Sequence, residues 1–102
     1  MDDESIAESA VETYLEVRAE AYGGKALKLR PPTGRGFPDR TVLLPHRWSA
    51  FVEVKRPKGG RIAKHQTTWG EDLRTYGQRF YIVATFAEVD ALFADYEQET
   101  GQ

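Results

Sequence analysis

The chain has 102 residues, 40% of them hydrophobic and 12% aromatic, with a formal net charge of −2. These values suit one globular domain, residues 1–102, with one modest core. The absence of cysteine excludes a disulfide framework and a thiolate zinc site. The first five residues are acidic and polar, unlike a signal peptide, and no apolar run approaches membrane-spanning length. We therefore expect a cytoplasmic setting and no membrane partner.

The small net charge hides a strong segregation of acids and bases along the chain. Residues 1–24 carry seven acids and one base, residues 25–64 eleven bases and two acids, and residues 65–102 seven acids and two bases. The two acids inside the basic block are Asp39 and Glu53. Such a block can be a solvated loop region, but bases that surround two carboxylates favour binding to phosphates, as in a nucleic acid.

The N-terminal segment predicts an amphipathic helix from Ser5 to Ala21, because apolar side chains recur there at helical spacing. Ser5 and Glu8 form a capping-box pattern at its start, and Gly23-Gly24 is a stop signal after its end. Glu12 lies at the edge of the apolar stripe. It is either a surface glutamate or a carboxylate that reaches a functional site.

A short strand and a loop are expected next. Lys25–Leu29 alternates as a strand and places Lys28 on the same face as Ala26. The Pro- and Gly-rich residues 30–38 predict a loop, which carries Arg30 and Arg35 and can lie along a nucleic-acid backbone.

Two strands, Thr41–Leu44 and Trp48–Lys55, predict an antiparallel hairpin with His46 in its turn rather than in a catalytic role. Asp39 precedes the first strand, and Glu53 and Lys55 end the second. The hairpin should therefore bring these three residues together.

Glu53 and Lys55 are two residues apart, so they share a face of their strand. The simpler interpretation is a solvated strand face, and the alternative is a metal site. Asp39 and Glu53 offer the hard oxygen ligands that Mg²⁺ and Mn²⁺ prefer, and Lys55 can hold a phosphate or a water beside them. Phosphodiester hydrolysis requires such a set.

A second basic loop covers residues 56–61, and a helix is expected from about Ile62 to Tyr76, with Gly77 as its C-cap. The spacing of Trp69, Leu73 and Tyr76 predicts a stripe that faces the core. For Trp69 we favour core packing over base stacking.

The C-terminal part predicts a buried strand at Arg79–Ala84 and a helix from about Phe86 to Gln98. Thr85 and Glu88 form the capping box of this helix, and the tail from Glu99 should fray. The expected buried residues are Val89, Leu92, Phe93 and Tyr96. The order α-β-β-β-α-β-α, with a final β-α-β unit, implies a mixed sheet with helices on both faces.

The chain resembles the VRR-NUC domain in its stand-alone phage and bacterial form, a compact branch of the PD-(D/E)xK nuclease superfamily. The resemblance extends from Val11 to about Leu92 and depends on the order and spacing of several fragments. These are Val11-Glu12-x-Tyr14-Leu15, Gly23-Gly24-Lys25-Ala26, Gly36-x-Pro38-Asp39-Arg40, Phe51-Val52-Glu53-Val54-Lys55, Gln66 and Phe80-Tyr81-Ile82-Val83. One departure is that Ile62-Ala63-Lys64-His65-Gln66 lacks the proline that the family often has before this glutamine.

The resemblance implies a restriction-endonuclease-like mixed β-sheet flanked by helices, and a Mg²⁺-dependent DNA endonuclease in which Mn²⁺ can substitute. Asp39, Glu53 and the main-chain carbonyl of Val54 would bind the metal, and Lys55 would position or activate the attacking water. Glu12 would orient the site or contact the metal through water. Gln66 would support the lysine or the water.

The basic side chains would grip the DNA backbone and read its shape rather than its sequence. They are Lys28, Arg30, Arg35, Arg40, Arg56, Lys58, Arg61 and Lys64. Free-standing members resemble junction-cleaving enzymes, so we expect a homodimer that makes paired cuts in branched DNA such as Holliday junctions, in a bacterial or phage-infected cell. The alternatives are a sequence-specific restriction-type endonuclease, for which the chain has little room for a specificity domain, and a non-catalytic nucleic-acid-binding module on the same scaffold.

Overall fold

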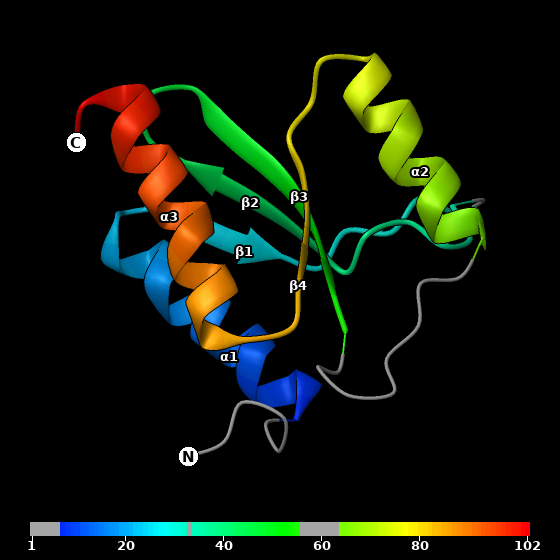
Figure 1. Ribbon diagram of the computed structural model, residues 1–102, viewed down its shortest axis with the longest axis horizontal. Coiled ribbons are helices and arrows are strands. Elements are labelled where there is room, and N and C mark those ends of the chain that lie inside the picture. The colour runs from blue at the N-terminus through cyan, green and yellow to red at the C-terminus, as the bar shows by residue number, and fades with distance from the viewer. Residues whose placement is uncertain (1–6, 33, 56–63) are drawn as a thin grey trace.

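The computed structural model describes residues 7–32, 34–55 and 64–102 and, for residues 64–67, the backbone alone (Figure 1). The elements are α1 (Glu8–Ala21), β1 (Lys25–Leu27), β2 (Arg40–Leu44), β3 (Trp48–Val54), α2 (Lys64–Thr75), β4 (Phe80–Val83) and α3 (Phe86–Thr100). This is the predicted order of helices and strands. No helix in the described part of the chain has the length and apolarity needed to cross a membrane.

The four strands form one mixed sheet in the order β1-β2-β3-β4. β2 and β3 form the predicted antiparallel hairpin, in which Arg40 pairs with Val52 and Leu44 with Trp48. His46 and Arg47 in the turn have positive φ angles of 66° and 59°, the left-handed conformation that tight hairpin turns use. β3 and β4 are parallel, as a crossover through α2 requires.

The main core lies between one face of the sheet and the pair α1 and α3, which lie side by side in Figure 1. The four predicted core residues of α3 are all buried: Val89, Leu92, Phe93 and Tyr96. α1 contributes Val11, Leu15 and Ala19, which have no exposed surface. Apolar burial on this scale is the dominant stabilising contribution to the fold.

α2 packs on β4, and its glycine permits the close approach. A Cβ atom on Gly70 would lie 2.5 Å from the Phe80 ring, so a larger residue would require the ring or the helix to shift. Leu73 is buried as predicted, but Tyr76 is 68% exposed, so its prediction as a core residue is wrong. The reason is that α2 ends at Thr75, and Tyr76 lies beyond its last turn.

Two strands differ from the prediction: β1 is shorter than expected, and β4 is only partly buried. β1 ends at Leu27, which leaves Lys28 outside the strand and exposed. In β4, Phe80 and Val83 are buried, but Ile82 is 37% exposed. The sequence pattern alone could not show this difference, because the whole run is apolar.

The predicted start of α1 is also corrected. The helix begins at Glu8 with Ala7 as its N-cap, which makes no side-chain capping hydrogen bond, so it starts later than predicted. The predicted capping box of Ser5 and Glu8 is not tested, because Ser5 lies outside the described residues. The predicted stop is confirmed. Gly23 has a φ of 86°, and the amides of Gly23 and Gly24 both donate, over 2.9 Å, to carbonyls of the last turn, as in a Schellman motif.

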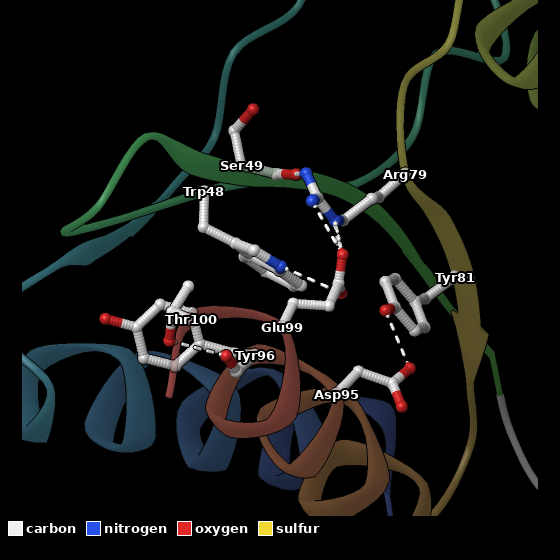
Figure 2. A network of polar contacts seen from close by, with 8 residues as sticks. All are labelled: Trp48, Ser49, Arg79, Tyr81, Asp95, Tyr96, Glu99 and Thr100. Atoms are coloured by element: carbon white, nitrogen blue, oxygen red, sulfur yellow. Dashed lines mark hydrogen bonds and ion pairs between the residues drawn. The ribbon is translucent and has the colours of Figure 1, made fainter. Parts of the chain in front are cut away.

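The prediction that the tail frays from Glu99 is wrong, because α3 continues to Thr100 and Glu99 is anchored to the sheet (Figure 2). Trp48 Nε1 donates to Glu99 over 3.0 Å, and Arg79 donates to the same carboxylate over 2.7 Å. The Arg79 guanidinium also lies 4.8 Å from the centre of the Trp48 ring. Gly101, with a φ of 76°, then ends the helix.

Candidate metal and active site

The hairpin brings Asp39 to the end of β3, as predicted. Because Arg40 pairs with Val52, the residue before Arg40 lies beside the last two residues of β3. Asp39 Oδ2 accepts a hydrogen bond of 2.8 Å from the Val54 amide. The carboxylate therefore continues the pairing of the two strands beyond the start of β2, and its position is fixed by β3.

Glu53 lies in the central part of the sheet, since β3 has β2 on one side and β4 on the other. It pairs with Ile82 and is only 3% exposed, so the interpretation of a solvated strand face is wrong. A carboxylate that has lost its contact with water needs hydrogen bonds, cations or a metal to compensate. Lys55, two residues after Glu53, is half-buried, and its amide donates to the Val83 carbonyl over 3.0 Å.

The Val54 carbonyl is directed to the same side as Asp39. Along a strand, the N–H and C=O of one residue point toward the same neighbouring strand. Since the Val54 amide donates to Asp39, the Val54 carbonyl also points to the β2 side of β3. Two residues with carboxylates, Asp39 and Glu53, and the Val54 carbonyl thus lie at the same end of the β2–β3 pair.

This donor set fits Mg²⁺ or Mn²⁺, which prefer oxygen ligands and keep several waters. Among the described residues, no group of three or more His, Cys, Asp or Glu side chains is placed to hold a metal ion. A metal here would therefore depend on Asp39, Glu53 and the Val54 carbonyl, with water filling the other positions.

Glu12 and Arg40 contact each other. Arg40 Nε donates to Glu12 over 2.9 Å, Arg40 pairs with Glu16, and its Nη1 donates to the Ala26 carbonyl over 3.2 Å. Arg40 is only 6% exposed. The prediction that Arg40 grips DNA is therefore wrong, because a guanidinium enclosed by α1 and β1 cannot reach a phosphate. Glu16 was missed in the sequence, although Glu12 and Glu16 are one helical turn apart.

The loop between β1 and β2 is attached to α2 by aromatic contacts that the sequence did not predict. The Phe37 ring meets those of Phe51 and Trp69 edge-on, at centroid distances of 5.6 and 4.9 Å. Trp69 Nε1 also donates to the Arg35 carbonyl over 3.1 Å. Trp69 therefore packs against the loop and holds the backbone of Arg35 in place.

The three basic residues of this loop, Lys28, Arg30 and Arg35, are exposed. Arg30 also lies beside the candidate metal site, since its Nη2 is 3.9 Å from Asp39 Oδ1. An exposed cation at that position is suited to a phosphate of a substrate strand.

Comparison with known proteins identifies the family. No family model matches the chain, and no curated protein matches it. A solved structure described as a VRR_NUC domain is similar, with a TM-score of 0.81 and 36% identity over 87% of this chain and 96% of that chain. The chain belongs to the VRR-NUC domain family. This confirms the predicted restriction-endonuclease-like α/β fold and makes the chain a nuclease-type domain.

The side chains of the remaining predicted residues of this VRR-NUC domain are not described by the structure. Arg56, Lys58 and Arg61 lie outside the described residues. Lys64 and Gln66 lie in the first turn of α2, where only the backbone is described. Their roles in DNA binding and in support of the site stay predictions.

Proposed function

We propose that this VRR-NUC domain is a Mg²⁺-dependent DNA endonuclease, with Mn²⁺ able to substitute, that hydrolyses phosphodiester bonds at branched DNA such as Holliday junctions. The main support is the arrangement at the end of β3, where Asp39 binds the Val54 amide beside the buried Glu53. Lys55, the residue after β3, adds a cationic side chain at the same end of the strand. Membership of a nuclease family supports the interpretation of this arrangement as a site for phosphodiester hydrolysis.

In the proposed site Asp39, Glu53 and the Val54 carbonyl would hold the divalent ion. When bound, this ion would supply positive charge to the scissile phosphate and make a nearby water more acidic. Lys55 positions the attacking water and offsets the negative charge that develops on the phosphate. Gln66 supports the lysine or the water.

The proposed partner is DNA that approaches on the side of the β1–β2 loop. Lys28, Arg30 and Arg35 bind its phosphates there, and Arg56, Lys58, Arg61 and Lys64 extend the contact. Because these bases offer no evident code for base edges, we expect recognition of DNA shape.

We further propose that two copies of the chain act as a homodimer. A four-way junction is nearly two-fold symmetric, so a two-fold dimer can place one active site on each of two opposite strands. Paired cuts at symmetric positions are the expected product.

The test is cleavage of a labelled four-way junction, with matched linear duplex, single-stranded and flap substrates, in Mg²⁺, Mn²⁺ and EDTA. We expect symmetric cuts in the junction with either metal and none in EDTA. Glu53→Gln and Lys55→Met should each lower the rate on the order of 100-fold or more. The matched control is Glu20→Gln, which neutralises an exposed carboxylate on α1 and should leave the rate unchanged.

Two other outcomes would replace the proposal. A fixed cut sequence on plain duplex would indicate a restriction-type endonuclease. Binding to these substrates without metal-dependent cleavage of any of them would indicate a non-catalytic nucleic-acid-binding module.

A further inference from the structure

Arg40 points away from the face of the sheet that carries Glu53. Side chains alternate along a strand, so Arg40 shares a face with Val42 and Leu44, which lie in the core beneath α1 and α3. Glu53 shares the opposite face with Phe51. Arg40 is thus a buried cation beneath an acidic helix, although it directly follows Asp39 in the chain.

The guanidinium of Arg40 is bound from two elements at once. Glu12 and Glu16 of α1 provide two carboxylates, and Ala26 of β1 provides a main-chain carbonyl. The Arg40 side chain is 7% exposed, while those of Glu12 and Glu16 are 24% and 39% exposed. The planar, multi-donor geometry of arginine suits this arrangement, and lysine could not reproduce it.

We infer that Arg40 is a positioning residue of the metal site and that Glu12 and Glu16 act through it. Arg40 is the first residue of β2, and its contacts hold the start of this strand against α1 and β1. Asp39 is the residue immediately before it. On its other side Asp39 is fixed by the Val54 amide, at 2.8 Å. The Asp39 carboxylate is therefore held between two anchors, one on β3 and one beneath the sheet.

This inference rests on the proposed function, because it concerns how well Asp39 is placed to hold a divalent ion. Groups that orient a metal ligand commonly change metal affinity about 10- to 100-fold when they are removed. The same inference assigns Glu12 a contact with Arg40 in place of a contact with the metal.

The test separates positioning from DNA contact. Arg40→Lys keeps the positive charge but loses the several N–H donors of the guanidinium. Glu16→Gln removes the charge of one Arg40 partner. Because the Glu16 side chain is partly exposed, this second variant should fold even if Arg40→Lys does not. Arg35→Met represents a DNA-contacting arginine, and Arg47→Lys, in the exposed turn at the far end of the hairpin, is the matched control. Circular dichroism confirms that each variant is folded at the assay temperature.

Three quantities are measured for each variant: Mn²⁺ affinity of the protein alone by electron paramagnetic resonance, DNA affinity in EDTA over a range of salt, and the single-turnover cleavage rate at saturating DNA. For Arg40→Lys we expect Mn²⁺ affinity to fall about tenfold, with a slower rate at limiting Mn²⁺. DNA affinity in EDTA should stay within twofold of the wild-type value. The slope of log affinity against log salt should be unchanged. Glu16→Gln should show the same pattern more weakly.

The opposite pattern would overturn the inference. If folded Arg40→Lys or Glu16→Gln binds Mn²⁺ like the wild type, Arg40 does not position the metal ligand. If Arg40→Lys loses DNA affinity in EDTA as Arg35→Met does, Arg40 contacts DNA. A wild type that binds Mn²⁺ but cleaves nothing contradicts the proposed function alone, whereas a wild type that binds no Mn²⁺ contradicts both.

Discussion

At the scale of single residues, Asp39 has two separable functions. One of its oxygens accepts the Val54 amide, which has no β2 residue opposite it. Under the proposed function, its negative charge would serve the candidate metal site. The hydrogen bond needs only an oxygen, whereas binding of a divalent ion depends on the negative charge.

Two substitutions at Asp39 should therefore have different effects on the stability of the fold and on metal binding. Asp39→Asn keeps an acceptor for Val54 and should leave the melting temperature nearly unchanged, but weaken Mn²⁺ binding at least tenfold. Asp39→Ala leaves the Val54 amide without this acceptor and should also cost about 1–3 kcal/mol of unfolding free energy. Thermal unfolding and Mn²⁺ titration of the two variants measure these effects. Equal Mn²⁺ affinity in Asp39→Asn and the wild type would contradict a ligand role.

The sequence predicted the proximity of Asp39 to Glu53 because local rules determine it. Strand alternation and a three-residue turn set the register of the hairpin, and the register decides which residues meet. The burial of Arg40 was missed because the buried part of the strand was predicted to begin at Thr41. Had it included Arg40, alternation would have placed this arginine on the core face beside Val42.

At the scale of elements, the last turn of α3 depends on contacts that the local sequence pattern cannot predict. Its core residues were predicted correctly because they follow helical spacing. Its last turn was not, because Glu99 is bound by Trp48 and Arg79, which are 51 and 20 residues away in the chain. Such partners become apparent only when the sheet has brought β3, β4 and α3 together.

This anchor should make stability depend on pH. The hydrogen bonds from Arg79 and Trp48 hold the pKa of Glu99 below its ordinary value of 4.5. A lowered pKa means that the stabilisation is complete above the ordinary value and is lost as pH falls through the lowered one. At pH 7, Glu99→Gln should cost about 1 kcal/mol, because the carboxylate is partly exposed and screened.

Thermal unfolding of the wild type and Glu99→Gln from about pH 7 to about pH 3 checks this prediction. The gap between their melting temperatures should narrow below about pH 4.5. Glu20→Gln, which lacks this anchor, is the control for loss of a carboxylate. A gap that stays constant down to the lowest pH would show that the charge of Glu99 does not stabilise α3.

At the scale of the whole molecule, charge is separated by layer. α1 and α3 together carry nine acids and one base, Arg18, and they cover one face of the sheet (Figure 1). The exposed bases Lys28, Arg30 and Arg35 lie in the loop between β1 and β2. Trp69 of α2 contacts this loop. A phosphate backbone is repelled by the first layer and attracted by the loop, so the field of the protein itself favours one side of approach.

This polarity predicts different effects for two exposed arginines. Arg35→Met should weaken DNA binding in EDTA and reduce the slope of log affinity against log salt by about 0.9, the loss of one phosphate contact. Arg47→Met removes the same charge at the hairpin turn, at the other end of β3 from Lys55, and should leave the slope unchanged. Fluorescence anisotropy with a labelled junction over a range of salt concentrations measures both slopes. Because net charge changes equally in the two variants, equal losses of slope would mean that DNA senses only the total charge. A loss confined to Arg35→Met would instead place the DNA on the side of Asp39 and Glu53, where cleavage requires it.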